Sequence, residues 1–202
     1  MRFEKGHKET TRRRIVEVAS RRFRRDGGSA SGLAGIMAEA GLTNGAFYPH
    51  FDSKEALFRE ALAAALAGQE ARLEGAGDAA KDIAGAIRHY LNLPHLEGSD
   101  EGCPSAALLP EIGREGEATR QVYEDGLLAY VDMLAERLPD AGTPAATERA
   151  TAIFALMVGT LQIARAVHNP RLARSILESG IEAALRLAQA LDSIGSAGEH
   201  RI

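Results

Sequence analysis

The chain has 202 residues, of which 45% are hydrophobic and 26% are charged, and this balance is ordinary for a folded globular protein. Its length suits one large domain or a small domain joined to a larger one. No run of about 18 apolar residues occurs and the N-terminus is charged, so we expect no membrane span, no signal peptide and a cytoplasmic location. The single cysteine, Cys103, excludes an internal disulfide framework and fits a reducing compartment.

The net charge of −4 hides a division along the chain. Residues 1–59 contain 12 Lys and Arg against 7 Asp and Glu, whereas residues 60–202 contain 12 against 21. A basic segment attracts a polyanion, and an acidic segment is repelled by one. The charge pattern therefore predicts that the first part of the chain meets nucleic acid and that the remainder has another role.

The predicted fold class is all-α. Apolar residues recur at spacings of three and four along the whole chain, and no segment shows the period-two alternation of β-branched residues that is typical of a strand. Glycines and prolines separate the helical segments. About nine helices are expected, at residues 7–25, 33–40, 43–50, 53–74, 78–93, 104–112, 117–138, 145–167 and 171–194.

The segment from residue 36 to residue 57 has the pattern of a helix-turn-helix followed at once by a third helix. Ala40-Gly41 supplies the tight turn after the first short helix, because glycine takes a positive φ without steric cost. Thr43 is expected to be the N-cap of the second short helix, and Ser53 the N-cap of the long helix that follows.

This segment resembles the TetR family of bacterial transcriptional repressors. Twelve positions match the family pattern: Ala40, Gly41, Leu42, Thr43, Gly45, Phe47, Tyr48, His50, Phe51, Ser53, Lys54 and Glu55. The resemblance implies an N-terminal three-helix DNA-binding head and a C-terminal helical bundle for ligand binding and dimerisation. The corresponding domains are residues 1–53 and 54–195, followed by a frayed tail at 196–202.

The expected DNA contacts are of two kinds. Base edges would be met by small and polar residues, since residues 43–50 contain no Lys or Arg, and these candidates are Thr43, Asn44, Gly45 and Ala46. The resemblance implies phosphate contacts by Tyr48, His50 and Lys54.

Other polar and basic residues of the head are expected to support these contacts. Gly32 stands where the family usually has Ser or Thr, so Ser31 is expected to cap the second helix one residue early and to meet phosphate. Arg12 or Arg13, with an arm that contains Arg2, Lys5 and Lys8, would add sequence-independent attraction, although most of these side chains would simply face solvent.

The last helix has apolar stripes on two faces and needs two partners. One alternative is burial on both sides within one chain, and the other is a two-fold, four-helix interface with a second copy. The resemblance favours the homodimer. The candidate interface residues are Ile153, Leu161, Leu177, Ile181 and Leu185.

An effector site is expected among the middle helices. Its candidates would give an apolar cavity with a few polar groups: His89, Tyr90, Cys103, Tyr123, Leu127, Tyr130, Phe154, Met157 and Gln162. Cys103 precedes Pro104 at a predicted helix start, where backbone amides favour a thiolate, and Gly-Cys-Pro resembles a branch of the family in which some members sense electrophiles or oxidants. The alternative is a small buried residue that packs the helix start.

The resulting hypothesis is a homodimeric DNA-binding regulator, a repressor that a small-molecule effector or modification of Cys103 releases from a palindromic operator in double-stranded DNA. No cofactor or metal is expected, and no paired carboxylates, nucleophile elbow or phosphate loop suggests an enzyme. The alternative is a dimeric helical ligand-binding or interaction protein with little specific DNA binding, because the recognition segment is uncharged.

Overall fold

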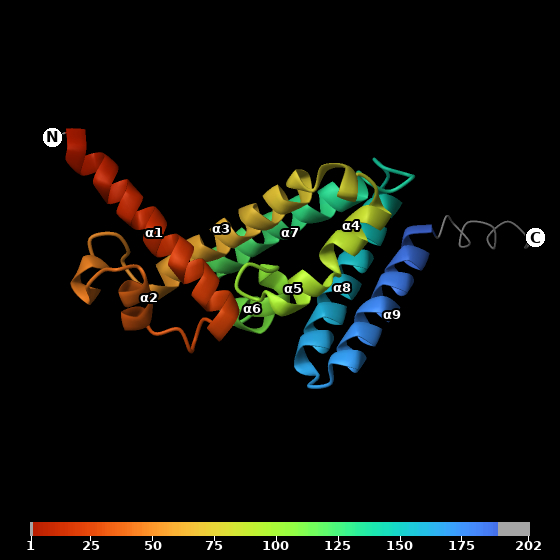
Figure 1. The fold of residues 1–202 in the computed structure, drawn as a ribbon. Helices are drawn as coiled ribbons and strands as arrows, with labels where there is room; N and C mark the ends of the chain where they lie inside the picture. The colour runs from red at the N-terminus through yellow and green to blue at the C-terminus, as the bar shows by residue number, and fades with distance from the viewer. Residues whose placement is uncertain (1, 190–202) are drawn as a thin grey trace, which may run out of the picture. The chain divides into compact units, whose positions relative to one another are not determined.

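The computed structural model describes residues 2–189, and within this range the chain forms helices and turns without a strand (Figure 1). The elements in chain order are α1 (Arg2–Asp26), α2 (Leu33–Glu39), η1 (Asn44–Ala46), α3 (Lys54–Gly75), η2 (Gly77–Ala80), α4 (Ile83–Tyr90), α5 (Leu93–Glu97), α6 (Pro104–Ile112), α7 (Glu117–Ala135), α8 (Pro144–Ala166) and α9 (Pro170–Gln189). The predicted all-α class is confirmed for the described residues, and they contain nine α-helices, as many as expected, although not all of them are the predicted ones. None of the helices in this range is long and apolar enough to cross a membrane.

The chain divides into two compact units, and each is described by itself. The first contains residues 1–75 and 93–130, and the second contains 76–92 with the chain from 131 onward. This division reflects packing within the molecule. The boundary predicted between residues 53 and 54 concerns function, and it stays a prediction.

The first unit is organised around one apolar core beneath α1. In α1 the apolar residues Ile15, Ala19 and Phe23 recur every four positions, so they share one helix face and are fully buried. That face packs on α2, α3 and α6. The Phe23 and Phe58 rings meet with centroids 5.2 Å apart, in a tilted arrangement that aromatic pairs favour. This core fixes the short elements that follow α1.

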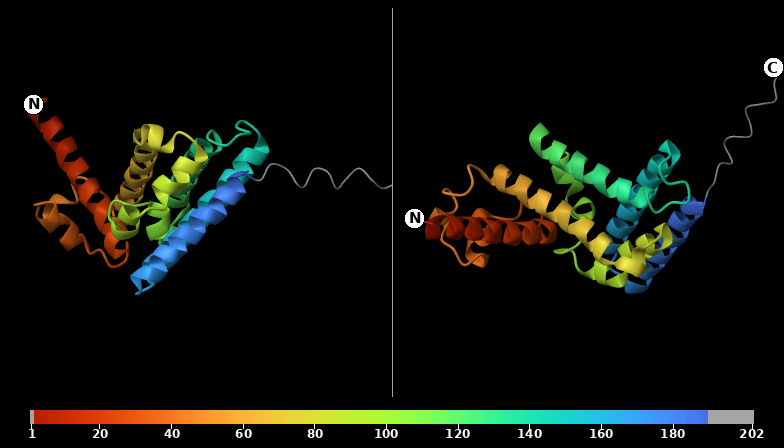
Figure 2. Two further views of the ribbon diagram at one scale, coloured as in Figure 1. Left: turned by 45° about the vertical axis from the view of Figure 1, so that its right-hand side comes forward. Right: turned by 90° about the horizontal axis from the view of Figure 1, so that it is seen from above.

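In the second unit, α8 and α9 lie side by side along their length (Figures 1 and 2). Gly180 of α9 is buried and lies against Thr160 of α8. A methyl group in place of the Gly180 hydrogen would lie 2.9 Å from the Thr160 Cβ, well inside van der Waals contact. Glycine at this position therefore permits the two helices to approach closely.

Two helix boundaries differ from the prediction for local reasons. The expected helix at 78–93 is divided because Asp82 caps a new helix, its carboxylate accepting a hydrogen bond of 2.7 Å from the Gly85 N–H. The expected loop after it contains α5, which has Pro94 in its first turn, where the missing N–H costs nothing. The predicted C-terminal end of the last helix and the frayed tail at 196–202 lie outside the described residues.

Gly180→Ala should destabilise the protein by about 1–3 kcal/mol, because the clash with the β-branched Thr160 outweighs the better helix propensity of alanine. Gly68→Ala in α3 is the matched control, since its new Cβ would meet only the Arg72 guanidinium at an ordinary 3.6 Å. The control should gain up to about 1 kcal/mol. Urea unfolding of the two variants measures both changes. A Gly180→Ala variant as stable as the control would contradict this account of the α8–α9 packing.

Candidate nucleic-acid interface

The turn after α2 has the geometry that its sequence predicts. Gly41 has φ +68, and the Leu42 N–H donates to the Met37 carbonyl at 2.8 Å while the Gly41 N–H donates to the Ala38 carbonyl at 2.9 Å. A positive φ with a hydrogen bond spanning five residues is the usual way for a helix to end at glycine. The turn sends the chain directly into the segment at residues 43–50, which we call the recognition segment.

The recognition segment is held by two buried phenylalanines and presents its other residues outward. Phe47 and Phe51 are buried, with stacked rings 5.4 Å apart. Thr43, Asn44 and Gly45 are exposed, Ala46 is half-buried, and Tyr48 is 71% exposed with its ring edge-on to Phe47. The predicted base-contacting residues therefore lie together on an accessible surface.

The expected second helix of the motif is a 3₁₀ turn followed by further turns. Only residues 44–46 are helical, and the chain then continues through turns in which the His50 and Phe51 N–H groups donate to the Phe47 carbonyl. Pro49 explains this, since it has no N–H for an α-helical bond and disfavours helical geometry at Tyr48. Thr43 occupies the predicted N-cap position, but its side chain makes no capping hydrogen bond.

Arg12 has an internal role that the sequence did not indicate. Its guanidinium donates to the His50 carbonyl and pairs with the Glu60 carboxylate of α3, and it lies 4.4 Å from the centroid of the Phe51 ring. Cation–π attraction and hydrogen bonds to the backbone thus join α1, α3 and the end of the recognition segment. Arg12, one of the two arginines expected to attract DNA, thus has a structural role, whereas Arg13 is exposed.

The predictions for the two serines have opposite outcomes. Ser53 caps α3, and its hydroxyl accepts a hydrogen bond of 3.1 Å from the Ala56 N–H, as predicted. Ser31 is fully buried and donates to the Arg22 carbonyl at 3.2 Å, while Gly32 holds the N-cap position of α2 without a side-chain cap. The expectation that Ser31 caps α2 and meets phosphate is therefore wrong, because its hydroxyl faces the protein interior.

The electrostatic surroundings of His50 matter for any contact with phosphate. Burial lowers the pKa of this half-buried imidazole below its usual value, and the nearby cations Lys8 and Arg12 lower the pKa further, against a smaller opposing effect of Glu9. These effects favour the neutral imidazole of His50 over the imidazolium. Lys54, in the first turn of α3, is half-buried and borders a small cavity.

The effector candidates of the first unit gather around α6 and α7. Tyr123 and Leu127 border a groove of about 490 Å³ whose remaining lining residues are Leu109, Ile112, Gly113, Glu117, Arg120, Gln121 and Glu124. The Tyr123 hydroxyl shares a hydrogen bond of 3.0 Å with Ser105, and burial raises the pKa of Tyr123. Tyr130, also on α7, is buried.

Cys103 is 1% exposed and forms the N-cap of α6, with Pro104 next to it as predicted. Its N–H donates to the His95 Nε2 at 2.9 Å. The structure also supplies a cation that the sequence did not reveal: the buried Arg24, whose Nε donates to the Asp100 carbonyl at 2.7 Å and which interacts electrostatically with Cys103. Burial first, and then Arg72, lower the pKa of Arg24 to about 10.

The remaining candidates belong to the second unit. Tyr90 and Phe154 meet edge-on within its core and Met157 is buried, whereas His89 and Gln162 are half-buried. The nine effector candidates are thus divided between two units. Within the described residues, no group of three His, Cys, Asp or Glu side chains is arranged to hold a metal ion.

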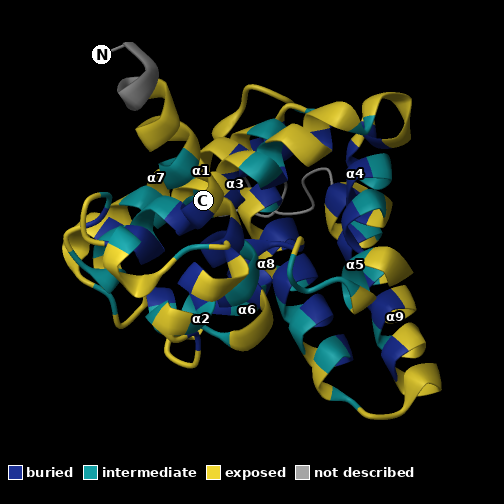
Figure 3. Ribbon diagram, turned by 60° about the vertical axis from the view of Figure 1, so that its left-hand side comes forward, coloured by how far each residue is buried: buried dark blue, intermediate teal, exposed yellow. Residues whose placement is uncertain are grey.

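The five candidate dimer residues differ in how deeply they are buried. Ile153, Leu161 and Leu177 are buried inside the second unit by the packing of α8 on α9, while Ile181 and Leu185 are half-buried. Buried and exposed positions alternate along these helices (Figure 3). The large apolar side chains exposed on them are Ile163, Leu172 and Leu187, none of which is among the predicted interface residues.

Comparison with known proteins agrees with this geometry. Residues 15–61 match the family model described as bacterial regulatory proteins, tetR family. Over 56 residues, 28% of this chain, the sequence is 43% identical to the HTH-type transcriptional regulator AcrR of Shigella flexneri, and the match spans 26% of that relative.

Two solved structures have the same fold over most of their length. The reduced form of NemR from E. coli has a TM-score of 0.71 at 20% identity, covering 88% of this chain and 96% of that one. AibR, solved in complex with isovaleryl coenzyme A and operator DNA, has a TM-score of 0.60 at 19% identity, covering 86% and 97%. Residues 15–61 therefore match the DNA-binding head of tetR-family regulatory proteins, and the solved structures show the same fold over most of the chain.

Proposed function

We propose that the protein is a homodimeric repressor that binds a palindromic operator in the cytoplasm and leaves it when an effector reaches the helices behind the head. The observation that carries the proposal is the recognition segment, in which exposed Thr43, Asn44 and Tyr48 are held in place by the buried rings of Phe47 and Phe51. An accessible polar surface on a rigid apolar support is what base recognition requires.

The proposed contacts follow from exposure and residue chemistry. Thr43 and Asn44 can exchange hydrogen bonds with base edges, Gly45 allows the backbone to approach, and the Ala46 methyl suits the methyl group of thymine. The Tyr48 hydroxyl, the His50 imidazole and the Lys54 ammonium would bind phosphate oxygens. This set keeps the predicted DNA-binding residues except Ser31.

A second copy is needed because one head reads only one half-site. The exposed Ile163, Leu172 and Leu187 on α8 and α9 support an interface there, since contact with a second copy would remove these large apolar side chains from water. The half-buried Ile181 and Leu185 on α9 would extend the same contact.

Two routes to release are supported by separate observations. The groove between α6 and α7 is large enough for a small organic molecule, with apolar Leu109, Ile112 and Leu127 and a polar rim. Modification of Cys103 at the start of α6 is the second route, because a group added to this buried residue would disturb the first turn of that helix. The nearly complete burial of Cys103 favours the packing alternative, and the labelling rate of the folded protein decides between these roles.

One observation favours the rival function of a dimeric ligand-binding or interaction protein with little specific DNA binding. The recognition segment contains no Lys or Arg, the residues that most often make specific contacts with guanine. A gel shift with the upstream region of its own gene, repeated over a range of salt concentrations, separates the two functions. Binding no tighter than to an unrelated duplex at every salt concentration would support the rival.

Tyr48→Ala and Lys54→Ala should each weaken operator binding by about 1–3 kcal/mol, and the lysine variant should reduce the slope of log affinity against log salt by about one. Neither should alter the unfolding free energy much, because Tyr48 is exposed and Lys54 half-buried. Fluorescence anisotropy measures the affinities. Lys81→Ala, at an exposed lysine of the second unit, is the control and should bind as the wild type does. Unchanged binding by both head variants would exclude this face.

Operator affinity should rise as the pH falls from about 7.5 to about 6. In the free protein the pKa of His50 is below its usual value, whereas a bound phosphate would favour the imidazolium and raise that pKa, so binding takes up a proton. This gain in operator affinity is lost as the pH rises through the pKa of His50 in the DNA complex. His50→Gln should remove this part of the pH dependence, and an identical pH profile in the variant would mean that His50 does not meet phosphate.

Ile163→Glu or Leu187→Glu should yield monomers that bind the operator at least about tenfold more weakly, because a charge cannot be buried unpaired in an apolar interface. Leu128→Glu on α7 makes the same change at another exposed leucine and should leave the dimer intact. Sedimentation equilibrium reports the mass. Dimers in the first two variants would move the interface away from α8 and α9.

A further inference from the structure

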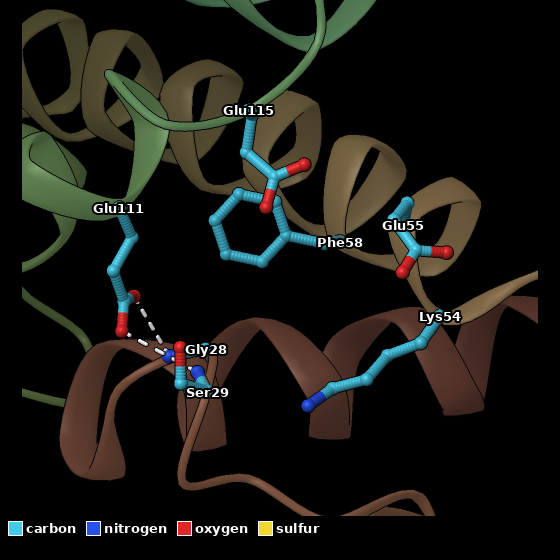
Figure 4. Close-up of a pocket in the computed structure, with 7 residues that line it drawn as sticks. All are labelled: Gly28, Ser29, Lys54, Glu55, Phe58, Glu111 and Glu115. Atoms are coloured by element: carbon cyan, nitrogen blue, oxygen red, sulfur yellow. Dashed lines mark hydrogen bonds between the residues drawn. The ribbon is translucent and has the colours of Figure 1, made fainter.

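A side chain from α6 contacts the turn between α1 and α2. Glu111 lies in the last turn of α6, and its carboxylate accepts hydrogen bonds from the backbone N–H groups of Gly28 at 2.8 Å and Ser29 at 3.4 Å (Figure 4). Both contacts span more than 80 positions of the sequence. A carboxylate that accepts from backbone amides forms charge-assisted bonds, which are stronger than bonds between neutral groups.

The turn is shaped to receive this carboxylate. Gly27 has φ +86, a conformation that side chains rarely allow, and it ends α1 through a hydrogen bond of 2.9 Å from its N–H to the Phe23 carbonyl. A Cβ at Gly28 would lie 2.8 Å from the Phe58 ring and 3.0 Å from the Glu111 Oε2. The backbone at Gly28 therefore fits between an aromatic ring of α3 and the carboxylate of α6.

A small cavity of about 170 Å³ marks the meeting point of these elements. It is lined by Gly28, Ser29, Lys54, Glu55, Phe58, Glu111 and Glu115 (Figure 4). Glu115 contributes a second carboxylate to the same cavity, but the hydrogen bonds to the turn come from Glu111 alone among the residues drawn. The cavity also borders Lys54, a proposed phosphate contact.

We propose that Glu111 is a positioning residue for DNA binding: its carboxylate holds the α1–α2 turn, and with it α2 and the recognition segment, in the arrangement that meets the operator. The inference rests on the proposed function. Two observations make α6 the place where an effector would act on this contact: Cys103 caps its first turn, and Leu109 and Ile112 line the groove. A displacement of α6 would withdraw the carboxylate from the turn.

The contact itself is tested by amide hydrogen exchange of the full-length protein, which needs neither DNA nor an effector. In the wild type the Gly28 amide should be protected. Exchange there should become about tenfold faster in Glu111→Ala, with an intermediate change in Glu111→Gln, whose amide oxygen still accepts a bond. Glu115→Gln removes the same charge from the same cavity and should leave exchange at Gly28 unchanged.

The positioning role is tested by anisotropy with a duplex from the upstream region of the protein's own gene. Loss of a negative charge alone would leave binding equal or slightly tighter in Glu111→Gln and Glu115→Gln alike. Positioning instead predicts that Glu111→Gln binds about three- to thirtyfold more weakly, and Glu111→Ala more weakly still, while Glu115→Gln does not.

Three results would overturn the inference: an unprotected Gly28 amide in the wild type, unchanged exchange in Glu111→Ala, or equal DNA affinity of the two Gln variants. If Glu111→Ala does not fold, the DNA affinity of the near-isosteric Glu111→Gln variant and the Gly28 amide exchange of the wild type still test whether Glu111 positions the turn. Failure of the wild type to bind the duplex is a different result, since it would contradict the proposed function while exchange still judges the Glu111 contact.

Discussion

Burial of Phe47 and Phe51 is the constraint on which the DNA-facing surface depends. The recognition segment cannot build an α-helical ladder because Pro49 interrupts it, so its backbone has few hydrogen bonds to fix its shape. Two stacked, buried rings supply that shape instead, and each contributes roughly 2–3 kcal/mol through removal of its apolar surface from water. The exposed side chains of Thr43, Asn44 and Tyr48 keep their places because these rings are held beneath them.

Arg12 extends this support to the neighbouring helices. Its guanidinium contacts the His50 carbonyl, the face of Phe51 and the Glu60 carboxylate, so α1 and α3 both fix the end of the recognition segment. Glu111 performs a comparable task at the opposite end of α2, where it binds the backbone of the turn before it. These two charged side chains lie at the two ends of the helix-turn-helix, and only Glu111 comes from a helix that borders the groove between α6 and α7.

The sequence was sufficient for several structural features that depend on neighbouring residues. Gly41 with its positive φ, Ser53 as a cap and Cys103 before Pro104 are local devices, and each is found where the pattern placed it. Pro49 was an available local signal against a regular recognition helix. By contrast, the roles of Arg12, Ser31 and Glu111 depend on partners brought near by the fold, and no periodicity identifies such partners.

An apolar helix face can be buried within its own chain or against a second copy, and the predicted interface residues did not distinguish these two cases. The predicted interface residues Ile153 and Leu161 are buried within one chain, whereas Ile163 and Leu187, which were not predicted, are apolar and exposed. Sequence alone cannot tell internal from external burial, since both remove the same surface from water.

The central claim is that two identical heads read two half-sites through the recognition segment. Hydroxyl-radical footprinting on a fragment recovered by genomic pull-down tests it most directly. The account predicts two protected patches related by two-fold symmetry, centred about one helical turn or a multiple of it apart on one face of the duplex. A single patch, or protection that follows no symmetric sequence, would contradict it.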